Sequence, residues 1–361
     1  MKKNYRFIFA GGGTGGHLFP GLAFANYLRE NLPNTDIMFI GTKKGIEVEK
    51  VPAADFKLEL IDIGGIKGTS KKNTIKNLFK IPKSIFMSKE IINNFAPDAV
   101  IGLGGYASGP ALISAWMDKY PTFIFEQNSV PGITNRILSK FVDNIFTTFE
   151  YSHKYFKKEK IVFSGNPVRK AIRETELKNS GNEIKNILIF GGSQGARKIN
   201  EIIAEASPML KDFNIIHQTG KYTYDKTREL YSKFNPKAEN IELTTFIEDM
   251  STAYNNADLI ICRAGATTIS ELKLVKKPSI LIPFPKATDN HQVLNALELV
   301  NSNSAIMIEE KDLTPEILVN KIMELKNSPE KYSEMKASFD LLPKQKTEEI
   351  ILNKIKEYIN L

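Results

Sequence analysis

Two glycine-rich segments, one in each half of the chain, have the composition of phosphate-binding loops. The first, Gly11–Gly16, follows the apolar run Phe7–Ala10, and the second, Gly191–Ala196, follows Ile187–Phe190. A strand, a glycine loop and a helix in that order present main-chain N–H groups to anionic oxygens. Two such units predict two nucleotide-type domains with a phosphate-bearing substrate between them.

The first loop matches the dinucleotide pattern Gly11-x-Gly13-x-x-Gly16, but the next predicted strand argues against a dinucleotide. A dinucleotide enzyme needs an acid at the end of that strand to hold the ribose. Here the strand ends in Gly41-Thr42-Lys43, and Asp36 stands at its beginning. Neither loop has the Lys-Ser/Thr ending of a P-loop. These features disfavour NAD binding and nucleotide triphosphatase activity.

His17 begins the helix after the first loop, at the sheet edge where such folds bind ligands. The positive helix end favours a neutral imidazole, which can take a proton from a hydroxyl. We interpret His17 as a general base, or as a helix-start histidine that only hydrogen-bonds to the loop. Sequence context leaves both interpretations open.

Further polar residues follow other predicted strands. Gly102–Pro110 and Glu126-Gln127-Asn128 fit a hydroxyl-rich substrate, or simply turns and helix caps. Ser193, with Arg169 and Arg197, has the chemistry that a departing diphosphate needs. Glu271, early in a predicted helix, fits two ribose hydroxyls, or only the helix dipole. Asp289–Gln292 begins another helix with a polar cluster, and no metal-ligand spacing appears.

Short apolar strands alternate with helical patterns along the whole chain, which predicts parallel strands covered on both faces. The strands are expected at 6–10, 37–41, 57–60, 99–102, 122–125, 144–147, 161–163, 186–190, 214–218, 241–244, 259–262 and 279–282. This indicates two doubly wound α/β domains. We expect an N-terminal domain over 1–165, a C-terminal domain over 166–346, and a helix over 347–361 that packs on either one.

The composition, with 42% hydrophobic and 25% charged residues, is typical of soluble globular proteins. No run of eighteen apolar residues predicts a membrane span, and the N-terminus lacks the apolar segment of a signal peptide. The single cysteine, Cys262, lies in an apolar strand pattern and is expected to be a buried thiol in a reducing compartment. We therefore expect a cytoplasmic protein.

The net charge of +8 belongs entirely to the first half, where 22 basic residues stand against 14 acidic ones through Gly165. The segment 66–95 contains seven lysines, one acid and several large apolar residues, and Pro82 is expected to divide it into two elements. The lysines are Lys67, Lys71, Lys72, Lys76, Lys80, Lys83 and Lys89. This mixture suits docking on an anionic bilayer, or a core-facing stripe with a solvated face. Nucleic acid ranks last because no known module is present.

Several motifs in register resemble the MurG family of bacterial N-acetylglucosaminyltransferases over essentially the whole chain. They are Gly12–Leu22, Gly104–Pro110, Glu126–Asn128, Pro131–Arg136, Gly165–Arg169, Gly191–Arg197, Phe246–Met250 and Arg263–Ala266. The resemblance implies a GT-B fold, in which two Rossmann-like, doubly wound parallel-sheet domains face each other across a cleft. The C-terminal domain would hold the UDP-sugar.

The resemblance also implies the reaction. N-acetylglucosamine would move, with inversion, from UDP-GlcNAc to the 4-hydroxyl of MurNAc-pentapeptide linked to undecaprenyl diphosphate. His17 would act as the base, and Tyr106 would lie with it on the acceptor side. The positions matched to donor contact are Thr14, Gly15, Gly16, Asn128, Arg169, Ser193, Ile247, Glu271 and Gln292.

Within this resemblance the Ile247 backbone would read uracil, Glu271 the ribose and Gln292 the sugar, while Ser193 and Arg169 would meet the diphosphate. No cofactor would be required, and a divalent cation would at most stimulate. The segment 66–95 would dock on the anionic cytoplasmic face of the cell membrane, and no nucleic acid is expected.

Two positions depart from the family pattern. Lys276 replaces a usual glycine, and Lys286-Ala287 replaces a usual histidine region near the donor. Two other functions remain as alternatives: a GT-B glycosyltransferase for another lipid such as diacylglycerol, and a non-catalytic UDP-sugar-binding protein. An intact His17 and Glu271 weigh against the second.

Overall fold

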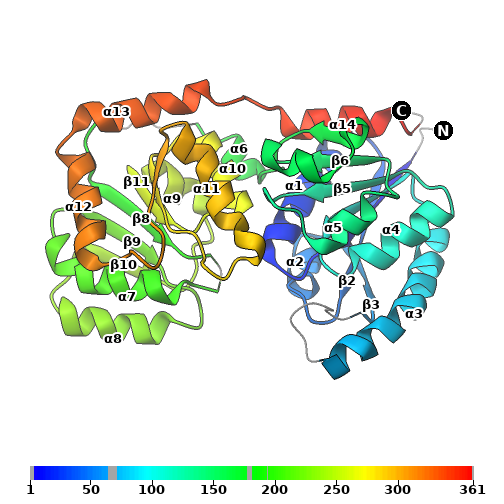
Figure 1. Cartoon of the computed structure of the whole chain (residues 1–361), viewed down its shortest axis with the longest axis horizontal. Coiled ribbons are helices and arrows are strands. Elements are labelled where there is room, and N and C mark those ends of the chain that lie inside the picture. Colours follow the sequence, from blue (N-terminus) through cyan, green and yellow to red (C-terminus); the bar gives the residue numbers. More distant parts are fainter. Residues whose placement is uncertain (1–3, 64–70, 177–180, 193, 360–361) are drawn as a thin grey trace. The chain divides into compact units, whose positions relative to one another are not determined.

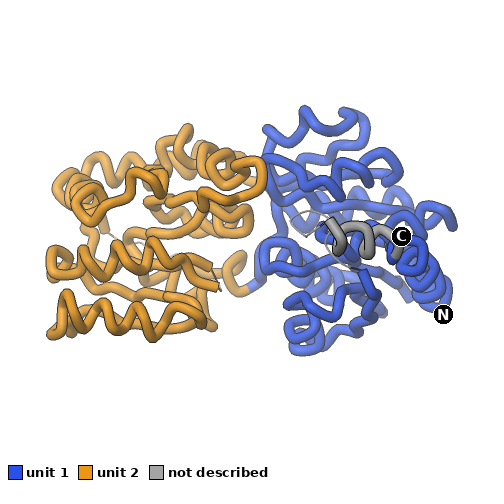
Figure 2. Tube along the Cα trace, turned by 60° about the horizontal axis from the view of Figure 1, so that its bottom comes forward, with its two compact units in different colours: residues 1–170, 345–361 blue, residues 171–344 orange. Residues whose placement is uncertain are grey.

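The computed structural model describes residues 4–63, 71–176, 181–192 and 194–359, with the side chains of residues 71–79 excepted. The chain forms two compact units, 1–170 with 345–361, and 171–344 (Figure 2). Each unit contains one wholly parallel sheet covered by helices, as Figure 1 shows. The prediction of two doubly wound α/β domains is confirmed.

The sheet of unit 1 has the strand order β3-β2-β1-β4-β5-β6-β7. Its strands are β1 (Tyr5–Gly11), β2 (Thr35–Thr42), β3 (Lys57–Ile61), β4 (Ala99–Gly104), β5 (Thr122–Glu126), β6 (Asn144–Thr147) and β7 (Ile161–Phe163). Its helices are α1 (Gly15–Asn31), α2 (Glu47–Ala53), α3 (Lys71–Phe95), α4 (Ser108–Met117), α5 (Ile133–Leu138) and α14 (Thr347–Lys356). The turns η1 (Glu150–Tyr155) and η2 (Lys158–Lys160) precede β7.

Alternate residues of β1 face opposite layers, as the period of a strand requires. Phe7 and Phe9 pack with α1 and α14, whereas Ile8 and Ala10 pack with α3 and α4. The C-terminal helix α14 thus belongs to unit 1, where Ile351 is fully buried. The sequence had left open which domain would receive this helix.

Unit 2 repeats the same strand order as β10-β9-β8-β11-β12-β13. Its strands are β8 (Asn186–Phe190), β9 (Asn214–Gln218), β10 (Ile241–Thr244), β11 (Leu259–Cys262), β12 (Ser279–Leu281) and β13 (Ala305–Met307). Its helices are α6 (Lys170–Arg173), α7 (Arg197–Ala206), α8 (Tyr224–Phe234), α9 (Met250–Asn256), α10 (Ala266–Val275), α11 (His291–Asn301), α12 (Pro315–Lys326) and α13 (Pro329–Ser338); the first residue of α6 is the last of unit 1. The turns η3 (Ser207–Met209), η4 (Thr288–Asn290) and η5 (Phe339–Leu341) join these elements.

Helix α3 continues through Pro82, so the predicted division of this segment is wrong. Proline cannot donate to the carbonyl four residues earlier. Pro82 is exposed, so water can satisfy that carbonyl and the helix persists. Among the described residues, no helix combines the length and apolarity that crossing a bilayer requires.

Candidate functional site

The first glycine loop joins β1 to α1 at the carboxyl end of the unit 1 sheet. Thr14 and Gly16 are exposed, and Thr14 stands at the N-cap of α1 with its carbonyl accepting from the N–H groups of His17 and Leu18. The first N–H groups of a helix have no partner within it. The amides at the start of α1 are therefore the anion-binding groups that this loop offers.

His17 lies against the glycine turn that follows β4. The Gly12 N–H donates to the Gly104 carbonyl at 3.2 Å, and a Cβ at Gly104 would lie 3.0 Å from the His17 ring. The His17 Nδ1 is 3.4 Å from the Thr14 hydroxyl. Tyr106, in the same turn, is 39% exposed. The structure thus brings together the residues predicted for the acceptor side.

The segment after β5 is less accessible than the sequence suggests. Glu126 and Gln127 are buried, and only Asn128 is half-exposed. The Glu126 carboxyl accepts from the Asn128 N–H at 2.9 Å and from Asn135 Nδ2 at 2.8 Å. Burial raises the pKa of Glu126 to about 7 even though these hydrogen bonds oppose the rise. Glu126 and Gln127 therefore lie inside the protein, where Glu126 holds Asn128 and Asn135 in place.

Arg169 lies in unit 1, at the end of the chain segment that follows β7. Its guanidinium is 6.0 Å from the ring centroid of Phe19, on α1. A Cβ at Gly15 would lie 2.8 Å from the same ring. Arg169 is therefore a neighbour of the first glycine loop, where its charge adds to the positive end of α1.

In unit 2 a cavity of about 640 Å³ lies over the second glycine loop, at the carboxyl ends of the strands. Its wall includes Gly192, Arg197, Phe284 and the predicted sugar contact Gln292. The Phe284 N–H donates to the Gln292 side-chain carbonyl at 2.9 Å, so the turn after β12 orients Gln292. Ser193 lies outside the described residues.

Arg263 holds that turn in place. Its Nη1 donates to the carbonyls of Ile282 and Pro283, both at 3.1 Å, and its Nη2 pairs with Glu310. The guanidinium also lies 5.4 Å from the Phe284 ring centroid. No role for Arg263 was predicted from the sequence.

Two predicted nucleoside contacts lie outside the wall of this cavity. Glu271 is only 4% exposed, and the Tyr254 hydroxyl donates to its Oε2 at 2.8 Å. The Ile247 N–H donates to Gln218 Oε1 at 2.9 Å, and Gln218 Nε2 donates to the Gly192 carbonyl at 3.2 Å. Gln218 thus ties the predicted uracil contact to the second glycine loop, a link that no spacing in the sequence indicated.

The departure at Lys276 is accommodated at the end of α10. Lys276 takes the left-handed conformation, with φ 50° and ψ 43°, and its N–H donates to the Leu272 carbonyl. Its ammonium pairs with Asp340 at 2.5 Å. A lysine therefore keeps the turn that glycine adopts without strain. Lys286, the other departure, lines the cavity beside Gln292.

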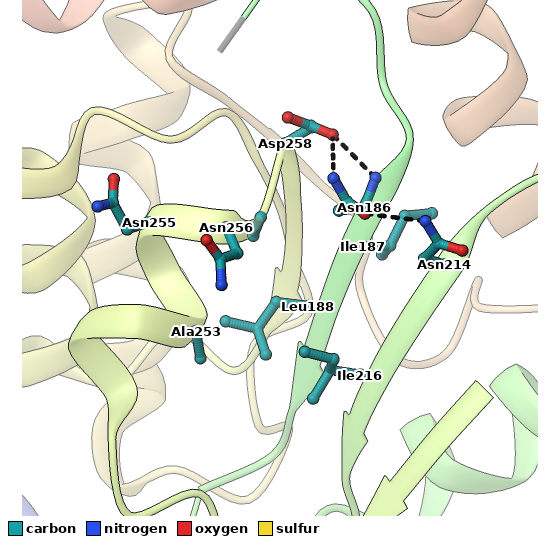
Figure 3. A pocket seen from close by; sticks show the side chains of 10 residues that line it. Asn186, Ile187, Leu188, Asn214, Ile216, Ala253, Asn255, Asn256 and Asp258 are labelled. Atoms are coloured by element: carbon teal, nitrogen blue, oxygen red, sulfur yellow. Dashed lines mark hydrogen bonds between the residues drawn. The ribbon is translucent and has the colours of Figure 1, made fainter. Parts of the chain in front are cut away.

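A second pocket of about 540 Å³ in unit 2 lies at the opposite, amino ends of the strands (Figure 3). Three of its polar side chains, Asn186, Asn214 and Asp258, already bond to one another. Asp258 accepts from the N–H of Lys185 at 3.0 Å and of Asn186 at 2.8 Å, and Asn214 donates to Asn186. These bonds join β8, β9 and β11, and ligands of such folds bind at the other end. In the described parts of the chain, no group of acids, histidines and cysteines is arranged to hold a metal ion.

Comparisons with known proteins agree with this architecture. The glycosyltransferase family 28 N-terminal domain matches residues 7–147, and the family 28 C-terminal domain matches residues 186–351. A relative from Anaeromyxobacter sp. (strain Fw109-5) is 44% identical over 91% of this chain and 87% of its own length. One from Myxococcus xanthus is 43% identical over 93% and 88%. Both are named UDP-N-acetylglucosamine–N-acetylmuramyl-(pentapeptide) pyrophosphoryl-undecaprenol N-acetylglucosamine transferase.

A crystal structure of Acinetobacter baumannii MurG is also similar, with a TM-score of 0.78 and 30% identity over 98% of this chain and 99% of that one. This likeness supports the predicted GT-B fold class. The chain belongs to the MurG family of glycosyltransferase family 28.

Proposed function

We propose that this member of the MurG family transfers N-acetylglucosamine from UDP-GlcNAc to the 4-hydroxyl of MurNAc-pentapeptide linked to undecaprenyl diphosphate. The observation that carries the proposal is the identity of 44% over 87% of the length of a relative that bears this activity in its name. The reaction completes the lipid-linked disaccharide precursor of peptidoglycan.

The chemistry is one displacement at the anomeric carbon. The MurNAc 4-oxygen forms a bond to that carbon, the bond to the UDP oxygen breaks, and the hydroxyl proton passes to His17. When the Nδ1 of His17 donates to the Thr14 hydroxyl, 3.4 Å away, its Nε2 has the lone pair that accepts the proton. Inversion follows because a single displacement occurs.

The departing UDP carries away the negative charge, and the chain offers positive groups for it. They are the amides at the start of α7, in unit 2, with the guanidinium of Arg169, in unit 1. Such fixed dipoles and cations stabilise developing charge without reorganisation. Gln292, Glu271 and Ile247 would contact the sugar, ribose and uracil.

The acceptor is a lipid, so we propose that unit 1 docks on the membrane. Helices α3, α4 and α5, of which α4 contacts both others, expose four large apolar side chains. These are Phe86, Trp116, Met117 and Ile137, between 46% and 70% exposed. Lys83 is exposed three residues before Phe86, whereas Lys80 pairs with Asp62 and Lys89 with Asp118, both at 2.7 Å. Large apolar side chains beside lysines suit an anionic bilayer surface. Lys67, Lys71, Lys72 and Lys76 lie outside the described side chains.

The test is transfer of labelled N-acetylglucosamine to a short-chain lipid-linked MurNAc-pentapeptide, with diacylglycerol as a parallel acceptor. Transfer to the MurNAc lipid alone is expected. Transfer to diacylglycerol instead would favour the other lipid glycosyltransferase, and UDP-sugar binding without transfer would favour a binding protein. His17→Gln keeps the size of the side chain but not a base, so turnover should fall by about 10²- to 10⁴-fold. Turnover within a few-fold of wild type would reject His17 as the base.

A further inference from the structure

Glu47, in the first turn of α2, is a fully buried carboxylate that joins two chain segments. Its Oε1 accepts from the Thr42 N–H at 2.8 Å and from the Thr42 hydroxyl at 3.0 Å. Its Oε2 accepts from the Gly13 N–H at 2.8 Å. The side chain therefore connects the carboxyl end of β2 to the first glycine loop.

The main chain around Glu47 leaves room for this carboxylate and little else. A Cβ would lie 2.7 Å from Oε2 if built on Gly12 and 2.5 Å from Cγ if built on Gly41, and closer still on Gly45. Real Cβ atoms do not approach other atoms so closely. Three glycines, one from the first loop and two from the end of β2 and the turn after it, thus enclose the side chain and hold it against Gly13.

The contact with Gly13 is connected to the candidate base His17 through the next residue, Thr14. Gly13 precedes Thr14, whose carbonyl accepts from the His17 N–H at 3.2 Å and whose hydroxyl lies 3.4 Å from the His17 ring. On its other side the loop is bonded to the turn after β4, because the Gly12 N–H donates to the Gly104 carbonyl. The loop that precedes His17 is therefore held from both sides.

All three donors to Glu47 require an acceptor. A carboxylate presents acceptors on both oxygens, whereas an amide presents one acceptor and one donor. A glutamine could accept from Thr42 or from Gly13, but its NH₂ group would then face the other N–H. Hydrogen bonds to a charged group are also stronger than those to a neutral one.

We infer that Glu47 is a positioning residue of the proposed transferase, one that sets the place of Thr14 and His17 by holding the Gly13 amide. Glu47 has no exposed surface and takes no part in the chemistry itself. The inference rests on the proposed function, because positioning is measured here through transfer. It also removes the Gly13 amide from the groups that could bind a substrate phosphate.

The experiment compares Glu47→Gln and Glu47→Asp with Glu49→Gln. Glu49 lies on the same helix, but its side chain is 78% exposed and its carboxylate pairs with the neighbouring Lys50. For each protein we would measure kcat and KM for the lipid acceptor, the Kd of UDP by calorimetry, the Tm, and amide exchange of Gly13 after ¹⁵N-glycine labelling. Activity is measured well below the Tm.

Displacing a reacting group by about 1 Å can cost about a hundredfold in rate. E47Q should therefore lower kcat by about ten- to a hundredfold and speed exchange at Gly13, while leaving the Kd of UDP within about twofold. E47D keeps both acceptors and should recover part of kcat. E49Q should match wild type throughout.

Two results would overturn the inference. The first is an E47Q kcat within about twofold of wild type, even with a lower Tm, because Glu47 would then be only structural. The second is an equal loss of kcat and of UDP affinity, which would indicate a general disturbance. If E47Q does not fold, E47D decides: faster exchange at Gly13 with a kcat within about twofold of wild type would overturn the inference. If wild type itself transfers nothing, the proposed function fails, and the role of Glu47 in transfer fails with it. If wild type is active and E47Q is unaffected, only the positioning role is rejected.

Discussion

The buried carboxyl of Glu126 should make the stability of unit 1 depend on pH. Burial raises its pKa to about 7, although hydrogen bonds from Asn128 and Asn135 oppose the rise. In the unfolded chain the same carboxyl titrates near 4.5. Between these values the folded state holds the proton more tightly than the unfolded state. The contribution of this group to the free energy of unfolding therefore falls as pH rises through that window.

The linkage relation gives the size of the effect. Between pH 5 and pH 8, a carboxyl that titrates near 7 when folded and near 4.5 when unfolded lowers the free energy of unfolding by about 2.5 kcal/mol. Glu126→Gln does not titrate. Its amide must replace an acceptor with a donor, so it carries a separate cost, but that cost does not change with pH. The free energy of unfolding of wild type, measured relative to that of E126Q, should therefore fall by about 2.5 kcal/mol from pH 5 to pH 8.

The pH dependence of the free energy of unfolding of wild type alone would not isolate the effect of Glu126. A buried histidine in unit 2 changes that free energy with pH in the opposite direction. His217 lies between the Tyr231 hydroxyl and Asn200 Oδ1, and burial lowers its pKa to about 3. Because the unfolded chain protonates His217 more readily, the contribution of His217 to the free energy of unfolding falls as pH drops below about 6.5. The contribution of Glu126 falls in the opposite direction, as pH rises. His217 is present in both proteins, so its effect cancels in the difference.

Urea unfolding at pH 5, 6, 7 and 8 measures that difference. Trp116 is the single tryptophan and lies in unit 1 with Glu126, so its fluorescence reports unfolding of the relevant unit. A difference between wild type and E126Q that is the same at pH 5 and pH 8, within about 0.5 kcal/mol, would refute the reasoning.

Three further outcomes are expected. Tyr254→Phe removes the hydroxyl that donates to Glu271, so the KM for UDP-GlcNAc should rise by about tenfold with kcat little changed; an unchanged KM would contradict the ribose role. Lys83→Glu combined with Phe86→Ser should weaken sedimentation with anionic vesicles and leave the weaker binding to neutral vesicles less affected; equal binding of wild type and variant to anionic vesicles would place the docking surface elsewhere. Ile355→Ala, in the buried face of α14, should lower the free energy of unfolding of unit 1 by about 2 to 5 kcal/mol in urea melts followed by Trp116 fluorescence; a loss below about 1 kcal/mol would show that the helix is not anchored there.

Most strands were predictable because their apolar runs are bounded by turn residues, as at Leu259–Cys262. The missed strand, Ala305–Met307, is only three residues long and only half-buried at its last two positions. The predicted strands β7 and β12 are equally short, so length alone does not account for the miss. The sequence also predicted a break at Pro82, but helix α3 continues through it. Pro82 is exposed, so water can satisfy the carbonyl that the proline leaves without a donor.

The site was less predictable than the fold. The sequence places polar residues after strands, but not the direction in which their side chains point. Glu126 and Gln127 were expected at the substrate edge and are buried beneath it. Glu47 and Gln218 bind main-chain groups of distant segments, and such contacts leave no regular spacing in the sequence.

The two glycine loops show why this distinction matters for function. Their sequences suggest unoccupied N–H groups, yet the chain itself uses several of them: Gly12 donates to Gly104, Gly13 to Glu47, and Gly195 to Gly192. Several of these glycines instead allow close approach, because a Cβ at Gly195 would collide with the Thr219 carbonyl. The capacity to bind a phosphate therefore lies mainly at the first turns of α1 and α7, where helix geometry leaves N–H groups without partners. Glycines in such a loop show how closely segments pack, and we propose that the Glu47 carboxylate, which holds the loop, sets the position of the candidate base His17.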